Sequence, residues 1–268
     1  MHFARRLFLF ALLLALLAPS VQAITLDWDT APWASGTLSH TYDIDPAKAG
    51  SDITVTVSGN TTALTTDLAA PNAMTPAIVN AFQGGLATTQ NTLCLAVDFA
   101  NQSQSVTVTV DFSALYAAGV QNVSFTLFDI DLANTTGNHY QDQLRNITAT
   151  SITGALVAPT ITTSANNTRT GTGLTQVVNG IASTNDLDPG SGLGNVTISF
   201  GTNAIKSFTF TYGSGTGGGS TDPTFQHVGI HDITYLAAVP EINPAWGAIG
   251  SCLVAAVLIL RHGAKFRK

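Results

Sequence analysis

The stretch Ser105-Val106-Thr107-Val108-Thr109-Val110-Asp111-Phe112 alternates polar and apolar side chains at every position. Successive side chains of a β-strand point to opposite faces of its sheet, so this alternation predicts a strand with one buried and one solvated face. A helix would instead need apolar residues every three or four positions. The segment therefore predicts a half-buried strand, and the same pattern extends outward from it in both directions.

Alternation recurs at 52–58, at 123–127, at 196–200 and at 208–212. Further candidate strands lie at 24–28, 38–44, 93–99, 144–151, 155–163, 174–183 and 228–236. Threonine, serine, asparagine, glycine and valine dominate these parts of the chain, which favours strands and turns. We predict an all-β fold, an antiparallel two-sheet sandwich with a jelly-roll-like topology, for the single domain over 24–236.

Two segments depart from the strand pattern. The segment 75–82, which is followed by Gly84-Gly85, predicts one or two helical turns. The glycine-rich segment 213–220 predicts a flexible loop. It is not a phosphate-binding loop, because no Lys-Ser/Thr pair follows and no strand-to-helix context surrounds it.

The charge balance of the domain is strongly acidic. The chain has a formal net charge of −6. The basic residues within 24–236 are Lys48, Arg145, Arg169 and Lys206, against fifteen aspartates in the same range. Such a surface repels a phosphate backbone, which excludes nucleic acid as a partner. Aspartate without glutamate in this range disfavours helices and favours turns and cation sites.

The N-terminus has the three parts of a secretory signal peptide. Arg5 and Arg6 precede an apolar run over 7–18, and small residues follow up to Ala23. The run is shorter than the ~20 residues of a membrane-spanning helix, which favours a cleaved leader over an uncleaved anchor. We predict a signal peptide over 1–23, with signal peptidase and the general secretion machinery as partners.

The C-terminus combines a polar motif at 239–244, an apolar segment at 245–260 and a basic end at 261–268. The apolar segment contains no charged residue, and four Lys or Arg residues follow it. This order predicts a transmembrane helix over 245–260 whose basic end stays in the cytoplasm. A buried core helix, the alternative, predicts neither the terminal position nor the basic end.

This tail resembles the PEP-CTERM family of bacterial sorting signals. Val239, Pro240 and Glu241 match the Val-Pro-Glu-Pro-like motif of the family, and Ile242 stands where its commonest form has a second proline. The resemblance covers 239–268. It implies processing by an exosortase, a membrane cysteine peptidase, and transfer from the inner membrane to the cell surface or extracellular matrix of a Gram-negative bacterium.

The body of the chain resembles a β-sandwich domain that is common in secreted bacterial surface proteins. The matching segments are 123–131, 140–144, 207–213 and 229–235. The resemblance implies display outside the cell and association with a matrix or an exopolysaccharide. It implies no particular activity.

Four aspartates form a candidate calcium site. Asp129 and Asp131 continue the apolar face that ends at Leu127, so alternation places both on the core side, ~7 Å apart at Cα. Buried carboxylates need a cation or hydrogen-bond donors, and oxygen ligands suit calcium. Asp142 and Asp232 are the candidate third and fourth ligands. The alternative is that these aspartates cap turns and face water.

Other candidate chemistry is sparse. Trp28 and Trp33 are candidates for stacking on sugar rings, with packing in the core as the alternative. His227 and His231 lie ~13 Å apart on a strand, too far to share a zinc ion. Cys94 lies in an apolar strand-like run, which predicts a buried structural thiol. The sequence contains no Gly-x-Ser-x-Gly nucleophile elbow in a strand-to-helix context.

These observations predict an exported, non-enzymatic protein of the cell surface or extracellular matrix. Exopolysaccharide is its candidate ligand and Ca²⁺ its candidate cofactor. A carbohydrate-binding module or adhesin with a defined ligand is the alternative. A polysaccharide-acting enzyme is the more distant alternative, because such an enzyme would need two aspartates as its acid and base.

Overall fold

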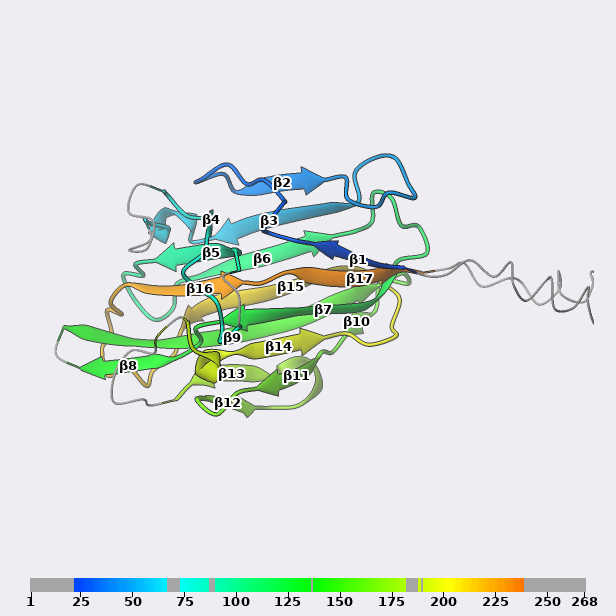
Figure 1. Cartoon of the computed structure of the whole chain (residues 1–268). Helices are drawn as coiled ribbons and strands as arrows, with labels where there is room; N and C mark the ends of the chain where they lie inside the picture. The colour runs from blue at the N-terminus through cyan, green and yellow to red at the C-terminus, as the bar shows by residue number, and fades with distance from the viewer. Residues whose placement is uncertain are drawn as a thin grey trace, which may run out of the picture. The chain divides into compact units, whose positions relative to one another are not determined.

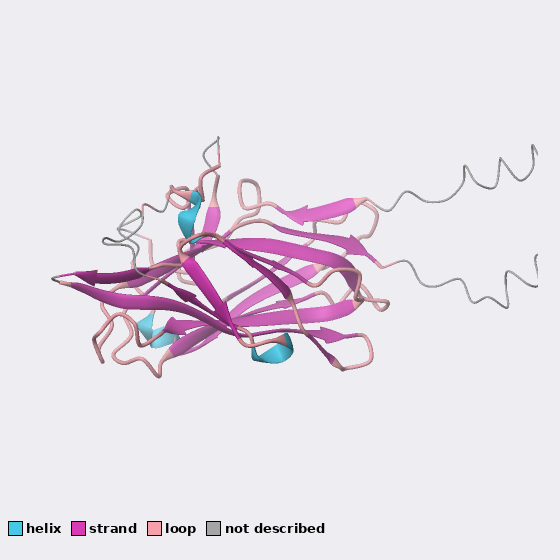
Figure 2. Cartoon of the chain, turned by 90° about the horizontal axis from the view of Figure 1, so that it is seen from below, coloured by secondary structure: helices cyan, strands magenta, loops and turns pink. Residues whose placement is uncertain are grey.

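The computed structural model describes residues 22–66, 73–86, 90–135, 137–181, 188 and 190–238. Within these ranges the chain forms seventeen β-strands and three single-turn 3-10 helices. The strands run antiparallel wherever they pair, and Figure 2 shows that helix is confined to short turns at the periphery. The prediction of an all-β, antiparallel fold is confirmed.

One group of strands forms the first layer of the fold (Figure 1). In order of pairing it contains β2 (Ser39–Tyr42), β3 (Ile53–Gly59), β6 (Ser105–Asp111), β15 (Ile205–Ser214), β9 (Asn138–Ser151), β13 (Val177–Gly180) and β12 (Asn167–Thr170). Two short strands, β8 (Leu132–Thr135) and β10 (Leu156–Val157), pair with the two ends of β9. The long strand β9 therefore pairs with four other strands of this layer.

A second group forms the opposite layer. It contains β4 (Ala77–Val79), β5 (Thr92–Val97), β16 (Gln226–Ile230), β7 (Val120–Phe128), β14 (Val196–Ser199) and β11 (Thr160–Thr163). Strand β17 (Ile233–Ala237) pairs with β7 on one side and with β1 (Ala23–Leu26) on the other. One residue pair, Ile205 with Val120, joins the two groups. The two layers of the sandwich thus belong to one continuous, curled sheet rather than to two separate sheets.

The hydrophobic core lies between the layers. Phe125 of β7 and Phe208 of β15 stack with ring centroids 4.7 Å apart and an interplanar angle of 16°. Both rings are buried, as are the alternating valines of β6. Aromatic pairs in such a geometry add about 0.5–1.5 kcal/mol beyond the burial of their area. The alternation in sequence therefore places its apolar members between the layers, as predicted.

Hydroxyl side chains cover the outer face of the first layer. Cross-strand pairs join Ser39 to Thr56 at 2.9 Å, Thr107 to Thr211 at 3.1 Å and Thr148 to Thr209 at 3.4 Å. Such pairs are the units that stabilise a solvated sheet face. The polar half of the alternating pattern therefore forms one continuous hydroxyl surface.

Two predictions about local structure are corrected. The segment 75–82 contains the strand β4, whose residues pair with Thr92–Cys94, and not a helix. Val79 and Phe82 pack there with Cys94 on the outer side of the second layer, so tertiary packing outweighs the local pattern. The predicted strand 228–236 is divided at His231-Asp232 into β16 and β17. Cys94 is buried, as predicted.

The predicted leader up to residue 21 and the whole tail, 239–268, lie outside the described residues. These include the sorting motif Val239, Pro240 and Glu241. No helix in the described ranges has the length and apolar character needed to cross a membrane. Ala23, where cleavage of the leader is expected, begins β1 and lies opposite Leu236 of β17. The two ends of the described domain therefore lie side by side.

Candidate functional site

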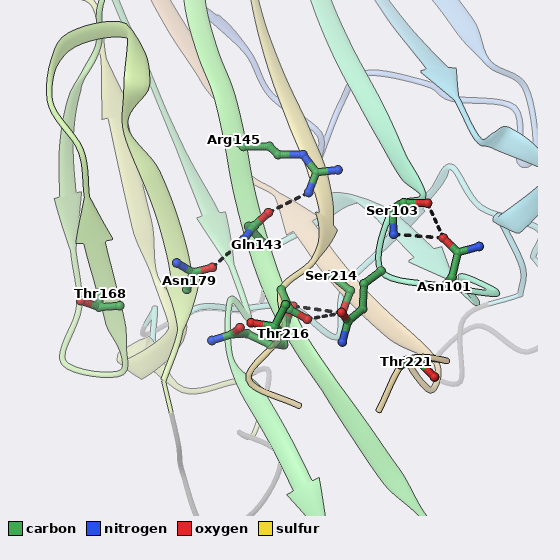
Figure 3. A pocket seen from close by; sticks show the side chains of 12 residues that line it. Asn101, Ser103, Gln143, Arg145, Thr168, Asn179, Ser214, Thr216 and Thr221 are labelled. Atoms are coloured by element: carbon green, nitrogen blue, oxygen red, sulfur yellow. Dashed lines mark hydrogen bonds between the residues drawn. The ribbon is translucent and has the colours of Figure 1, made fainter. Parts of the chain in front are cut away.

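A polar groove of about 690 Å³ opens on the outer side of the first layer, around β9 (Figure 3). Its lining comes from β9, from the β12–β13 hairpin, and from the loops that follow β5 and β15. The lining residues are Asn101, Gln102, Ser103, Gln141, Gln143, Arg145, Thr168, Asn179, Ser214, Gly215, Thr216 and Thr221. The side chains in this set are amides and hydroxyls, together with the guanidinium of Arg145.

The floor of the groove follows from the alternation of β9. Asp142 and Leu144 point to the core and are 1% and 0% exposed, so Gln141, Gln143 and Arg145 point outward. Gln143 donates from Nε2 to Oδ1 of Asn179 on β13 at 2.9 Å. Arg145 donates from Nη1 to Oε1 of Gln143 at 2.7 Å. These bonds join Arg145, Gln143 and Asn179 in one row.

A bulge in β9 keeps this row on the outer face. Thr209 pairs with Thr148, whereas Thr211 pairs with Arg145, so β9 contains one residue more than β15 over this stretch. The extra residue is Asn146, whose φ is 52°, a left-handed conformation that asparagine adopts more readily than most residues. Without the bulge, Arg145 and Thr148 would point to opposite faces.

The glycine-rich loop after β15 closes one side of the groove. Gln141 accepts a hydrogen bond at Oε1 from the Gly217 N–H at 2.8 Å and donates from Nε2 to the Gly180 carbonyl at 2.8 Å. A Cβ at Gly215 would lie 2.2 Å from Oε1 of Gln141. A side chain at this position would have to displace the Gln141 amide, because the loop backbone lies directly on the β9 side chains. The loop is therefore a wall of the groove.

The lining consists mainly of side chains that donate and accept hydrogen bonds. None of the lining residues is Asp, Glu, His or Cys, so the groove offers neither an acid–base pair nor a metal-ligand set. The amides and hydroxyls supply both donors and acceptors. A hydroxyl-rich ligand can pair with such groups at every position, since each of its hydroxyls also donates and accepts.

Three of the four candidate calcium ligands are buried, and the charges of Asp131 and Asp129 both act on Asp142. Asp129, Asp131 and Asp142 are 2%, 0% and 1% exposed. Asp142 accepts hydrogen bonds from the Tyr212 hydroxyl at 2.5 Å, from Gln226 Nε2 at 3.1 Å and from the Asp131 N–H at 3.0 Å. Burial, and then the charge of Asp131, raise the pKa of Asp142 well above its usual value. The cluster is therefore buried as predicted, with donors that compensate Asp142.

The fourth candidate ligand, Asp232, lies elsewhere. Its Oδ1 accepts a hydrogen bond from the Trp28 N–H at 3.0 Å, and His231 and Asp27 are among its electrostatic neighbours. Burial raises the pKa of its carboxyl. Within the described ranges, no group of three or more His, Cys, Asp or Glu side chains is arranged to hold a metal ion. Calcium binding at Asp129, Asp131 and Asp142 stays a prediction.

The two tryptophans do not contact solvent in a way that suits sugar stacking. Trp28 and Trp33 are 1% and 8% exposed and pack edge to face, with ring centroids 6.4 Å apart. Trp28 also packs against Tyr42 at 6.1 Å. This corrects the expectation of a carbohydrate contact at these residues, because their ring faces are covered by the core.

His227 and His231 lie in the second layer, away from the groove lining. His227 Nε2 lies 2.8 Å from Oδ2 of Asp129, and the His227 ring lies between Phe82 and Phe225. His231 packs against Phe128, with ring centroids 5.0 Å apart. The two histidines therefore have separate aromatic surroundings and separate carboxylate neighbours.

The sequence patterns do not predict the groove. The pattern that could have indicated the groove is the alternation of Gln141, Gln143 and Arg145 with buried residues. The predicted strand begins only at Leu144, so it does not include the first two of these residues. The walls come from segments far apart in sequence, such as Asn101 and Asn179, which no local pattern brings together.

Comparisons with known proteins give only distant structural similarity. No protein-family model matches the chain, and no curated protein matches it. The family 11 carbohydrate-binding module from Clostridium thermocellum, in complex with a β-1,3-1,4-mixed-linked tetrasaccharide, aligns over 82% of this chain and 99% of its own, with 12% identity and a TM-score of 0.31.

Two further solved structures align at a similar level. The N-terminal domain of a Streptococcus gordonii adhesin covers 70% of this chain and 42% of its own, with 10% identity and a TM-score of 0.30. A carbohydrate-binding module specific for non-crystalline cellulose covers 56% of this chain and 76% of its own, with 11% identity and a TM-score of 0.28. Similarity at this level carries no functional conclusion for this chain.

Proposed function

We propose that this chain is an exported, non-catalytic carbohydrate-binding protein of the cell surface or extracellular matrix. The observation that carries the proposal is the hydrogen-bonded row of Arg145, Gln143 and Asn179 along the floor of the groove, with Gln141 on the same face of β9. This is the alternative that the sequence left open, and it now has a specific surface. The groove would bind one segment of a glycan chain.

The geometry supports recognition through hydrogen bonds. Gln143 is held by both Asn179 and Arg145, so its amide is fixed before a ligand arrives. Fixing side chains in advance reduces the loss of conformational entropy on binding. The lining contains no aromatic residue, so affinity comes from polar contacts and from the fit of the groove.

A polysaccharide-cleaving activity has less support. Glycoside hydrolysis uses two carboxyl groups that flank the scissile bond, and the groove lining supplies none. Asp142 lies directly beneath the floor, but its carboxyl is buried on the core side and bonded to Tyr212 and Gln226. The groove therefore favours binding over turnover.

Export and sorting form the second part of the proposal. The leader at 1–23 and the motif Val239, Pro240 and Glu241 support secretion, transient anchoring in the inner membrane by 245–260, and processing by an exosortase. Replacing Pro240-Glu241 with Ala-Ala in the native host is expected to block processing and surface display. Unchanged processing would contradict sorting by this motif.

Binding is tested on the full chain, purified in a non-ionic detergent, by affinity electrophoresis through gels that contain soluble polysaccharides. We expect retardation by at least one polysaccharide and its loss in the variants Gln143→Ala and Asn179→Ala. Gln121→Ala is the matched control, since Gln121 lies on β7 in the other layer. Equal retardation of all variants, or none with any polysaccharide, would contradict the proposal.

A further inference from the structure

We infer that the groove selects an acidic polysaccharide with widely spaced uronic acid residues, and that Arg145 binds the sugar carboxylate. This inference rests on the proposed function and specifies its ligand class. It is carried by the charge of the lining, by the way Arg145 is presented, and by the acidity of the rest of the protein.

Arg145 is the one charged residue among those that line the groove. Asp142, its nearest acidic neighbour along β9, is 1% exposed and points to the core. The other basic residues of the domain lie elsewhere. Lys48 lies over the Tyr116 ring, 4.4 Å from its centroid, and Arg169 on β12 donates to the Ile161 carbonyl at 2.9 Å. The groove is therefore a local positive site on an acidic protein.

The structure holds the Arg145 guanidinium in a fixed position. Nη1 donates to Oε1 of Gln143 at 2.7 Å. Among the described residues, this is the one side-chain hydrogen bond that Arg145 makes. It uses one of the five N–H donors of a guanidinium. A Cβ at Gly213 would lie 3.1 Å from Nη1 and 3.2 Å from Nη2, so the group rests directly on the β15 backbone. Figure 3 shows Arg145 in line with Gln143 and Asn179.

A fixed, planar guanidinium suits a carboxylate. Two parallel N–H donors match the two oxygens of a carboxylate, and such charge-assisted bonds are about twice as strong as neutral ones. The neighbouring amides, Gln143 and Asn179, would pair with the hydroxyls of the same sugar. A uronic acid residue combines both kinds of group, whereas a neutral sugar leaves the arginine without a charged partner.

The net charge of the protein limits the charge density of the ligand. The chain has a formal net charge of −6, which repels a dense polyanion at distances beyond contact. A Debye length of about 8 Å at physiological ionic strength screens distant aspartates more than it screens a contact pair. A polysaccharide with isolated carboxylates therefore gains the contact with Arg145 without the full repulsion.

The test compares galacturonan chains that differ only in methyl esterification. The full chain in detergent is titrated calorimetrically with fully methyl-esterified, partly esterified and unesterified polygalacturonate, at about 0.15 M salt. We expect the partly esterified polymer to bind at least tenfold more tightly than the fully esterified one. Dextran sulfate and dextran are titrated as a second pair. Comparing their binding separates a requirement for carboxylate from a response to any anion.

Arg145→Gln is expected to remove the tenfold preference, and Arg145→Lys to keep only part of it because lysine lacks the planar fork. Arg169→Gln is the matched control and should retain the preference. Gly213→Ala should weaken it by displacing the guanidinium while the charge remains. Equal binding of esterified and partly esterified polymers, with Gln143→Ala still reducing both, would overturn the inference and leave carbohydrate binding intact. No binding of any polymer would overturn both.

Discussion

Arg145 donates a hydrogen bond of 2.7 Å to Gln143, and this bond joins the one positive charge of the groove to its amide row. Two residues that share a bond should not act independently on a ligand. We expect Gln143→Leu and Arg145→Gln each to weaken glycan binding, and the double variant to lose less than the sum of the two. Calorimetric titration of the four proteins in this cycle measures the coupling, and strict additivity would contradict it.

Gly180 couples the wall of the groove to the buried aspartates. A Cβ at this position would lie 1.9 Å from the backbone oxygen of Asp131, while the Gly180 carbonyl accepts the Gln141 side chain. We expect Gly180→Ala to destabilise the fold by about 1–3 kcal/mol, the usual cost of overpacking, and to weaken glycan binding. Urea denaturation and affinity electrophoresis measure the two effects.

The control for this substitution is Gly190→Ala. Its added carbon would meet the exposed Asp188 side chain at 3.1 Å, and that side chain can move aside. A loss of stability in Gly190→Ala as large as that in Gly180→Ala would contradict the packing argument. Full stability of Gly180→Ala would contradict it as well.

The sequence predicted the parts of the fold that local alternation controls. The pattern around Val108 placed β6 correctly, and the same alternation placed Phe125 and Phe208 in the core. A strand with one buried and one solvated face must alternate apolar and polar residues, so its sequence shows a period of two. The helix predicted for 75–82 is wrong because the strand there, β4, is stabilised by packing of Val79 and Phe82 in the second layer. Local sequence patterns do not contain such tertiary contacts.

The sequence predicted the buried aspartates better than the groove. The face that ends at Leu127 pointed to Asp129 and Asp131, and both are buried, although Asp129 leaves the strand with a φ of 67°. The groove depends on the bulge at Asn146 and on walls from distant segments. Bulges and long-range contacts arise from tertiary pairing, so an analysis of single strands could not find them.

The contact between Phe125 and Phe208 predicts where the core is most sensitive. We expect Phe125→Ala to cost about 3–5 kcal/mol, because it removes a large buried ring and leaves a cavity. Thr126→Ala, on the neighbouring outward position of β7, removes one hydrogen bond to Thr197 of 3.0 Å and should cost about 0.5–1.5 kcal/mol. Denaturant titration measures both, and comparable losses would argue against a core between the layers.

The raised pKa of Asp142 predicts a pH dependence of stability. Burial, followed by the Asp131 charge, raises this pKa in the folded state above the unfolded value of about 3.9. The contribution of the group is therefore fully present below the unfolded pKa and is lost as the pH rises through the folded pKa. We expect wild-type stability to fall more steeply than that of Asp142→Asn as the pH rises from about 4.

Thermal unfolding across this pH range measures the difference in slope. Asp222→Asn, at an exposed aspartate, is the control and should follow the wild-type curve. Parallel curves for the wild type and Asp142→Asn would refute a titration at Asp142. If Asp142→Asn fails to fold, Tyr212→Phe tests the same network, since the Tyr212 bond lowers the Asp142 pKa and its loss should extend the fall in stability to higher pH.

Calcium binding at the buried aspartates should stabilise the folded protein. A cation beside Asp129, Asp131 and Asp142 would offset the mutual repulsion and desolvation of their carboxylates, although it would have to displace the hydrogen bonds that Asp142 now accepts from Tyr212 and Gln226. At about 100 times Kd, a ligand of the folded state adds about 2.7 kcal/mol of stability. We expect calcium to raise the melting temperature at neutral pH and a chelator to reverse the rise.

Two aspartate variants locate the ion. Asp131→Asn should abolish the calcium-dependent rise, whereas Asp232→Asn should keep it, because Asp232 bonds to Trp28 and takes no part in the cluster. Magnesium should have a smaller effect, since it demands a tighter octahedral set of ligands. If calcium leaves the melting temperature unchanged, or still raises it in Asp131→Asn, the three carboxylates are held by the hydrogen bonds of the protein alone.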